Sequence, residues 1–146
     1  MNLSKNIKLV KVGAYNDTQN TTDIDGSDVD FTGYDGVLFF GWLEIKTAST
    51  DTNKLVVEQK SGSTYTALTG AEAEATENGM VLWVDVYRPL ESQGKIVRGA
   101  YRLNTNTKKG DMYAILYNGR VLPTDLINEA TNGMNGALVI SPVVTT

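Results

Sequence analysis

The 146-residue sequence contains no cysteine and no histidine. The absence of cysteine excludes disulfides, a thiol nucleophile and a zinc–thiolate centre. The absence of histidine removes the most frequent general base, the most frequent transition-metal ligand and the side chain that titrates nearest neutral pH. Paired carboxylates and serine–lysine chemistry remain possible in principle, but no spacing of these residues indicates either. We therefore predict that the protein is not an enzyme.

Basic residues and long hydrophobic runs are also scarce. Lys and Arg number 13 against 17 Asp and Glu, which gives a net charge of -4 and a pI near 4.8. Surfaces that bind nucleic acid are clustered and basic, so nucleic acid is not an expected partner. The longest apolar run, 37–43, is far too short to span a bilayer. The N-terminal residues lack the apolar segment of a secretory signal. We expect no membrane association and no cofactor.

Strong helix formers do not gather into an amphipathic run, whereas apolar and polar residues alternate in many short stretches. A period of two residues is typical of β-strands. Residues 70–79 fit an exposed edge or loop, 118–119 an Asn-Gly hairpin turn that leads into a returning strand, and 124–130 a helical turn. The alternation predicts strands at 7–12, 28–31, 36–45, 55–60, 65–68, 80–87, 96–103, 111–117 and 138–144.

This pattern predicts an all-β fold, a single-domain antiparallel β-sandwich over residues 1–146, jelly-roll-like, with about eight to ten short strands. Residues 1–12 form an N-terminal arm or first strand. They carry Lys5, Lys8 and Lys11 without an acidic neighbour. Such a segment can bind an acidic surface or add a strand to another chain, or it can be an ordinary first strand with a solvated lysine face.

Residues 36–45 are apolar on both faces of the predicted strand. An antiparallel sheet normally buries one face and exposes the other to water. We expect the odd face, with Val37, Phe39, Leu43 and Ile45, to pack in the sandwich core. The even face, with Phe40 and Trp42, would then contact either a second core layer or a partner subunit.

Aromatic side chains recur on several predicted strands. Such rings fill a core, stack on sugars or anchor a protein interface, and the sequence leaves these alternatives open. Arginines near the same strands suit the rim of an interface. The candidate interface residues are Lys5, Lys8, Lys11, Phe40, Trp42, Trp83, Tyr87, Arg88, Arg98, Arg102 and Arg120.

Acidic residues form two further features. Asp23, Asp25, Asp28 and Asp30 surround a glycine and are candidate calcium ligands. The glycine comes too early for an EF-hand and no glutamate closes the loop, so we interpret the segment as a solvated turn and assign no metal site. Asp85 lies in mid-strand among apolar residues, where an ion pair with Arg88, Arg98 or Arg102 is expected.

Four segments, 1–10, 33–40, 82–89 followed by Arg98, and 117–123, resemble in this order a family of small structural proteins of tailed bacteriophages. The resemblance implies a β-sandwich protein that decorates or cements the phage head, without catalytic residues. It implies the major capsid protein as partner, a homo-oligomer that is most simply a trimer, and a place on the surface of the virion head after assembly in the host cytoplasm. A reducing cytoplasm suits a chain without cysteine. The alternatives are a neck, tail or fibre-base component of the virion, and a carbohydrate-binding β-sandwich module.

Overall fold

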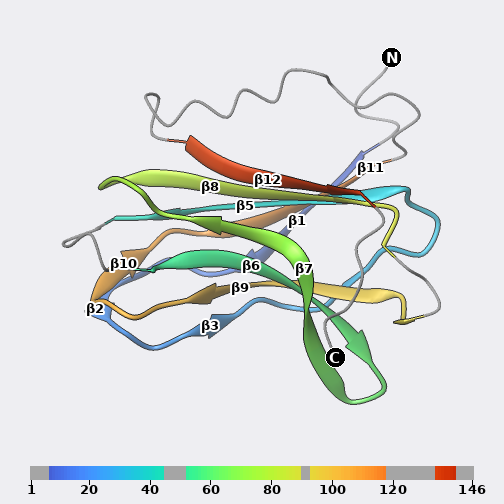
Figure 1. Ribbon diagram of the computed structural model, residues 1–146, viewed down its shortest axis with the longest axis horizontal. Helices are drawn as coiled ribbons and strands as arrows, with labels where there is room; N and C mark the ends of the chain where they lie inside the picture. The colour runs from blue at the N-terminus through green and yellow to red at the C-terminus, as the bar shows by residue number, and fades with distance from the viewer. Residues whose placement is uncertain (1–6, 45–51, 90–92, 118–133, 141–146) are drawn as a thin grey trace.

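The computed structural model describes residues 7–44, 52–89, 93–117 and 134–140, the last range by its backbone. These residues form two β-sheets that stack face to face (Figure 1). The first sheet has seven strands: β1 Ile7–Gly13, β2 Asn16–Asn20, β5 Gly36–Leu43, β8 Met80–Tyr87, β10 Thr107–Lys109, β11 Met112–Tyr117 and β12 Met134–Ile140. The second has five: β3 Ile24–Asp25, β4 Val29–Asp30, β6 Lys54–Ser61, β7 Thr64–Glu74 and β9 Ile96–Arg102.

The strand order is that of a jelly roll. β1 pairs with β11, β2 pairs with β10, and β3 and β4 both pair with β9. The consecutive strands β1 and β2, β3 and β4, and β10 and β11 can therefore each be counted as one interrupted strand. The first sheet then runs β1/β2, β10/β11, β5, β8, and the second runs β3/β4, β9, β6, β7. When the merged strands are numbered in chain order, the first sheet has the order 1, 8, 3, 6 and the second has the order 2, 7, 4, 5, which is the order of a jelly roll. This arrangement confirms the predicted all-β, jelly-roll-like sandwich.

β12 departs from the expected antiparallel pairing. It lies beside β8 in parallel, from Met134 opposite Val81 to Ile140 opposite Tyr87. A parallel neighbour cannot be reached by a tight hairpin and needs a long connection. The sequence predicts the last strand at 138–144, and in the structure it begins earlier, at residue 134. The predicted hairpin at 118–119, the helical turn at 124–130 and the residues after 140 lie outside the described ranges.

The core fills the space between the two sheets. On β5 the odd-numbered Val37, Phe39 and Leu43 are fully buried, as their parity predicts. Ile45, the last member of that predicted face, lies outside the described residues. Alternate residues of β8 and β11 point into the same core, and Tyr101 and Phe31 are its largest buried rings.

β7 is longer than predicted. It continues through Glu74, and Ala71, Ala73 and Ala75 are at most 3% exposed. The prediction of an extended edge at 70–79 is right for its first half, because β7 is the last strand of its sheet. The predicted exposure holds for Gly70, Glu72 and residues 76–79 and is wrong for the three alanines. Small alanine side chains let β7 pack closely against β8 and β12, which buries one of its faces.

No helix among the described residues is long and apolar enough to cross a membrane.

Candidate functional site

The outer face of the seven-stranded sheet, here called the aromatic face, is built mainly from aromatic and aliphatic side chains. Its members alternate with the core residues of β1, β5, β8 and β11. Strand register aligns them in three cross-strand rows: Lys11–Tyr113–Phe40–Trp83, Leu9–Ile115–Leu38–Asp85 and Ile7–Tyr117–Gly36–Tyr87. Trp42 continues β5 on the same face, opposite Val81.

Five of the predicted interface residues therefore share one face: Lys11, Phe40, Trp42, Trp83 and Tyr87. The Phe40 and Tyr113 rings stack with centroids 5.5 Å apart. Trp83 is buried, whereas Phe40, Trp42 and Tyr87 are partly exposed. These rings do not lie between the two sheets, so the alternative that they fill the sandwich core is wrong for them.

The side of the aromatic face along β1 is the most open. Leu9 is 60% exposed and Tyr15, which follows β1, is 56% exposed. Asp111 organises this margin: its Oδ1 accepts hydrogen bonds from the Tyr15 backbone N–H at 2.7 Å and pairs with Lys11 Nζ at 2.8 Å. Its Oδ2 accepts from the Tyr113 hydroxyl at 3.2 Å. The Lys11 hydrogen bond is the main reason why the pKa of Asp111 is lowered.

A single carboxylate, Asp85, lies within the rows and is 3% exposed. The Tyr117 hydroxyl donates a hydrogen bond to its Oδ1. Burial raises the pKa of Asp85 to about 6, and the Tyr117 hydrogen bond opposes that shift. Gly36 makes room for the phenol, because a Cβ there would lie 2.4 Å from Tyr117 Cζ. The expected ion pair of Asp85 with Arg88, Arg98 or Arg102 is wrong, because none of these three arginines pairs with it.

Arg88 instead stands at the end of β8. Its guanidinium carbon lies 5.2 Å from the centroid of the Tyr87 ring. Its backbone has φ of 52°, a left-handed conformation that is costly for a residue with a Cβ, and its N–H donates to the Asp35 carbonyl at 2.7 Å. The exposed Arg88 side chain thus lies at the corner of the aromatic face, next to Tyr87. Lys5 and Arg120, two further candidates, lie outside the described residues.

The outer face of the five-stranded sheet, here called the charged face, has a different character. Glu58 on β6 is 8% exposed and lies between two arginines of β9. Its Oε2 is 2.7 Å from Arg98 Nη2 and its Oε1 is 2.6 Å from Arg102 Nη2. Asp25 pairs with both arginines, at 3.1 and 2.8 Å, and Asp23 approaches Arg102 at 3.8 Å. Arg98 and Arg102 are therefore paired within the chain.

Tyr65 on β7 extends this network. The Arg98 guanidinium lies 3.7 Å from the centroid of its ring, and its hydroxyl donates to Asp28. Lys60 also binds Asp28, at 2.9 Å. The Tyr65 and Lys60 hydrogen bonds lower the pKa of Asp28. Asp30 accepts from the Thr32 backbone and hydroxyl, which lowers its pKa too.

The candidate calcium ligands consequently each bind basic or hydroxyl groups of the chain, and Asp23 and Asp25 share Arg102. Asp23 and Asp25 face arginines, Asp28 binds Lys60 and Tyr65, and Asp30 binds Thr32. Within the described ranges, no three acidic side chains come together as a metal site would require.

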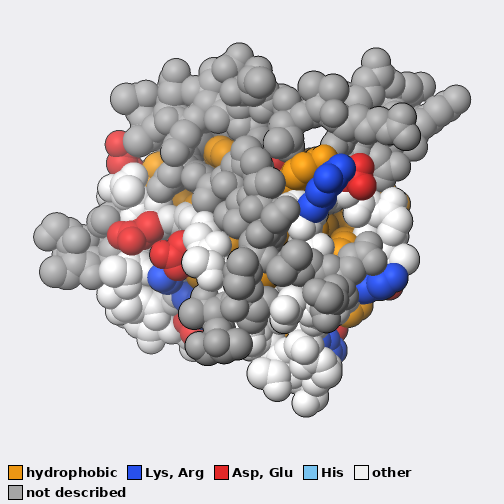
Figure 2. Space-filling model, turned by 45° about the vertical axis from the view of Figure 1, so that its right-hand side comes forward, with side chains coloured by type: hydrophobic (Ala, Val, Ile, Leu, Met, Phe, Trp, Pro, Cys, Tyr) orange, Lys and Arg blue, Asp and Glu red, His pale blue; other side chains and the backbone are white. Residues whose placement is uncertain are grey.

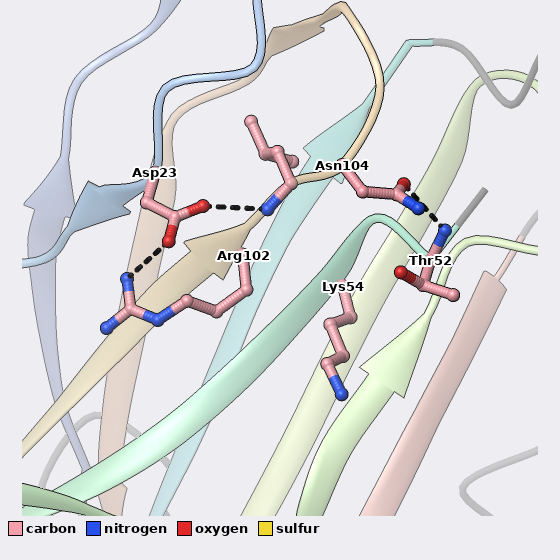
Figure 3. Close-up of a pocket in the computed structure, with 6 residues that line it drawn as sticks. Asp23, Thr52, Lys54, Arg102 and Asn104 are labelled. Atoms are coloured by element: carbon pink, nitrogen blue, oxygen red, sulfur yellow. Dashed lines mark hydrogen bonds and ion pairs between the residues drawn. The ribbon is translucent and has the colours of Figure 1, made fainter.

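An open hollow of about 150 Å³ lies where β6 begins and β9 ends (Figure 3). Its polar groups already bind one another. Asp23 accepts from the Leu103 backbone N–H at 2.8 Å, and Asn104 accepts from the Thr52 backbone N–H at 2.8 Å. Lys54 Nζ is 2.8 Å from Glu72 Oε2. The charged groups that line the hollow are therefore already paired, and they do not form the acid and base of a catalytic site.

The described residues define an all-β jelly-roll sandwich with one aromatic and one charged outer face. On the side shown in Figure 2, hydrophobic side chains reach the surface beside acidic and basic ones. No family model and no curated protein matches the sequence.

Seven chains of solved structures are similar to this protein, among them the two that follow. One is the SPBc2 prophage-derived protein YomS, with 12% identity and a TM-score of 0.43 over 75% of this chain and 91% of that one. Another is a chain in the structure of infectious bursal disease virus Gx strain, with 9% identity and a TM-score of 0.42 over 80% of this chain and 34% of that one. At this level of similarity, neither supports an inference about function.

Proposed function

We propose that this protein is a structural component of a tailed-phage virion, and specifically a head decoration protein that binds the lattice of the major capsid protein. It would act as a homo-oligomer, most simply a trimer, on the surface of the head after assembly in the host cytoplasm. In this role it needs rigid contacts and no reactive groups. The resemblance of four sequence segments to such proteins supports the same function.

The observation that carries the proposal is the contrast between the two outer faces. On the charged face, Glu58, Arg98, Arg102 and Asp25 neutralise one another. On the aromatic face, stacked and partly exposed rings such as Phe40 and Tyr113 take the place of the polar residues that usually face water. Aromatic anchors beside arginine are the side chains that dominate binding energy in protein interfaces. The aromatic face, with Arg88 at its corner, is therefore the surface that would meet the capsid.

The test is binding of the purified protein to phage heads that lack it, measured by co-sedimentation. We expect Tyr87→Ala, which removes a ring from the aromatic face, to weaken binding about tenfold, or about 1.4 kcal/mol. Tyr65→Ala is the matched control, because it removes the same ring from the charged face. Heads that do not retain the wild-type protein would refute the proposal, and light scattering that shows a monomer would refute the oligomer.

A neck, tail or fibre-base component would use the same kind of surface but occur in far fewer copies. Quantitative mass spectrometry of virions separates these roles, because a decoration protein occurs in hundreds of copies and a neck protein in about a dozen.

One observation favours carbohydrate binding as a second candidate function. Tyr15 is 56% exposed, and its backbone N–H and the hydroxyl of Tyr113, whose ring stacks on Phe40, both donate to Asp111, which also pairs with Lys11. Sugars bind on aromatic platforms of this kind, with polar groups at the side. A glycan array, followed by quenching of tryptophan fluorescence with the best oligosaccharide, tests this function. No binding to any glycan would remove it.

A further inference from the structure

The strand edges of the two sheets are protected to different degrees. On one side of the sandwich, β7 packs against β12. On the other side, β3 and β4 are only two residues long, and β2 consists entirely of polar residues. Short and polar edge strands discourage pairing with other chains. β1 is different, since four of its seven residues are aliphatic and, among the described strands, it pairs with β11 alone.

Among the described residues, the part of this edge without a second partner strand is the stretch Ile7–Lys11. Beyond it, the Val12 carbonyl already accepts a hydrogen bond from the Ser27 backbone N–H at 2.7 Å. The irregularity in the pairing of β1 also falls after Lys11. In an antiparallel pair, alternate residues direct their N–H and C=O groups away from the partner strand. No residue of the described chain pairs with these outward groups of Ile7–Lys11.

Side chains along this stretch specify the chemistry of a strand that would pair with it. Leu9 is 60% exposed and faces the aromatic side, next to Ile115. Lys8 projects to the opposite side and is exposed. Of the two lysines in this stretch, Lys11 already pairs with Asp111 at 2.8 Å, whereas Lys8 has no ion pair among the described residues. Residues 7–11 contain no acidic residue, so a second copy of β1 offers no charge to match Lys8. A partner strand with apolar residues beside Leu9 and acidic residues beside Lys8 would match the apolar side chain of Leu9 and the charge of Lys8.

We propose that the free edge of β1, Ile7–Lys11, accepts an extended segment of a partner protein in which apolar and acidic residues alternate, as an added strand of the seven-stranded sheet. Backbone hydrogen bonds would supply much of the affinity, and the side chains beside Leu9 and Lys8 the specificity. The inference rests on the proposed function, because it describes the segment of the major capsid protein that would be bound.

The experiment compares variants in binding to heads that lack the protein. Leu9→Asp places a negative charge where the acidic strand would lie, and Lys8→Glu reverses its complementary charge. We expect each to weaken binding about tenfold. Ala67→Asp is the matched control, because Ala67 is an exposed strand residue on the edge of the other sheet. Its binding should stay within about twofold of the wild type, and urea denaturation checks that all three variants are folded.

A second readout detects strand addition itself. Amide hydrogen exchange of residues 7–11 should slow at least about tenfold when the wild-type protein is bound to heads, because outward N–H groups become hydrogen-bonded. Wild-type protein that fails to bind heads would overturn the proposed function and this inference together. Wild-type binding with unprotected amides at 7–11, or with Lys8→Glu as tight as wild type, would overturn the inference alone. Protection that appears in the free protein as its concentration rises would mean that a second copy is the occupant, and would also overturn it.

Discussion

The Tyr101 hydroxyl accepts a hydrogen bond of 3.0 Å from the backbone N–H of Trp42. Tyr101 belongs to β9 in the five-stranded sheet and Trp42 to β5 in the seven-stranded sheet, so this bond crosses the core. The same hydroxyl lies 3.4 Å from the Gly110 carbonyl, to which it donates. Burial raises the pKa of Tyr101, which therefore stays neutral and able to donate. The Tyr101 hydroxyl thus links the two sheets through hydrogen bonds and constrains their relative position around Trp42 and Gly110.

Tyr101→Phe should lower the free energy of unfolding by about 1–3 kcal/mol, because it leaves the Trp42 N–H without its acceptor inside the core. Urea denaturation measures the change. Tyr15→Phe, at an exposed tyrosine, is the control and should leave the midpoint unchanged. Equal midpoints for Tyr101→Phe and wild type would show that the bond contributes nothing.

Gly41→Ala should be more damaging still. A Cβ at Gly41 would lie 1.9 Å from Tyr101 Oη, so the ring or the strand must move, at a cost of about 3 kcal/mol or more. Removal of the hydroxyl relieves part of this clash. The double variant with Tyr101→Phe should therefore lose less stability than the sum of the two single variants. Additive losses in thermal or urea denaturation would contradict the predicted contact.

Asp85→Asn should stabilise the protein at neutral pH. The folded-state pKa of Asp85 is about 6, above the ordinary 3.8 of the free side chain, so the folded protein binds the proton more tightly than the unfolded chain does. Its contribution to the free energy of unfolding is present below about pH 4 and is lost as pH rises to about 6. Asn keeps an acceptor for Tyr117 without the charge. We expect a gain of about 3 kcal/mol at pH 7 and almost none at pH 3.5, and a gain independent of pH would contradict this origin.

Glu58→Gln should destabilise the charged face. Arg98 and Arg102 would each lose a nearly buried carboxylate, and breaking such a network costs about 3 kcal/mol. Glu72→Gln is the control, because Glu72 is 55% exposed and its pair with Lys54 contributes less than about 1 kcal/mol. Urea denaturation of both variants at low and high salt tests the difference. Similar losses for the two would mean that burial of Glu58 does not matter.

EDTA should leave the melting temperature unchanged. The four aspartates between 23 and 30 are each held by an arginine, lysine, tyrosine or threonine group of the chain. A bound calcium ion would have to displace these partners. A melting temperature that falls in EDTA and recovers with calcium would contradict this arrangement.

The long strands follow from the sequence because one of their faces is buried against a second sheet. On β5 and β8, alternation of apolar residues reports that burial directly, and Val37, Phe39 and Val84 lie in the core as their parity predicts. The short strands β2, β3 and β10 contain polar residues and depend on pairing with residues that are distant in the sequence. Lys109, for example, pairs with Leu43 and Asn16. No local pattern contains that information.

The candidate surface was accessible to prediction only in part. Parity placed Phe40 and Trp42 on the side of β5 away from the core, and the shared face with Trp83 follows from the register of β5 and β8. Glu58 and Asp111 were not foreseen, because their partners come from strands that are remote in sequence. The assignment of Asp85 to an arginine failed for the same reason, since its partner Tyr117 is 32 positions away.

The first strand of the jelly roll pairs with the last, as shown by Ile7 opposite Tyr117. During synthesis, β1 leaves the ribosome long before β10 and β11 exist. The seven-stranded sheet cannot close at this side until about a hundred further residues have been made. Closure of so long a loop makes folding slow, in the millisecond-to-second range typical of β-sandwiches. Until then, the apolar strand that later forms an edge has neither of its edges paired, and this is the period in which the chain is most exposed to aggregation.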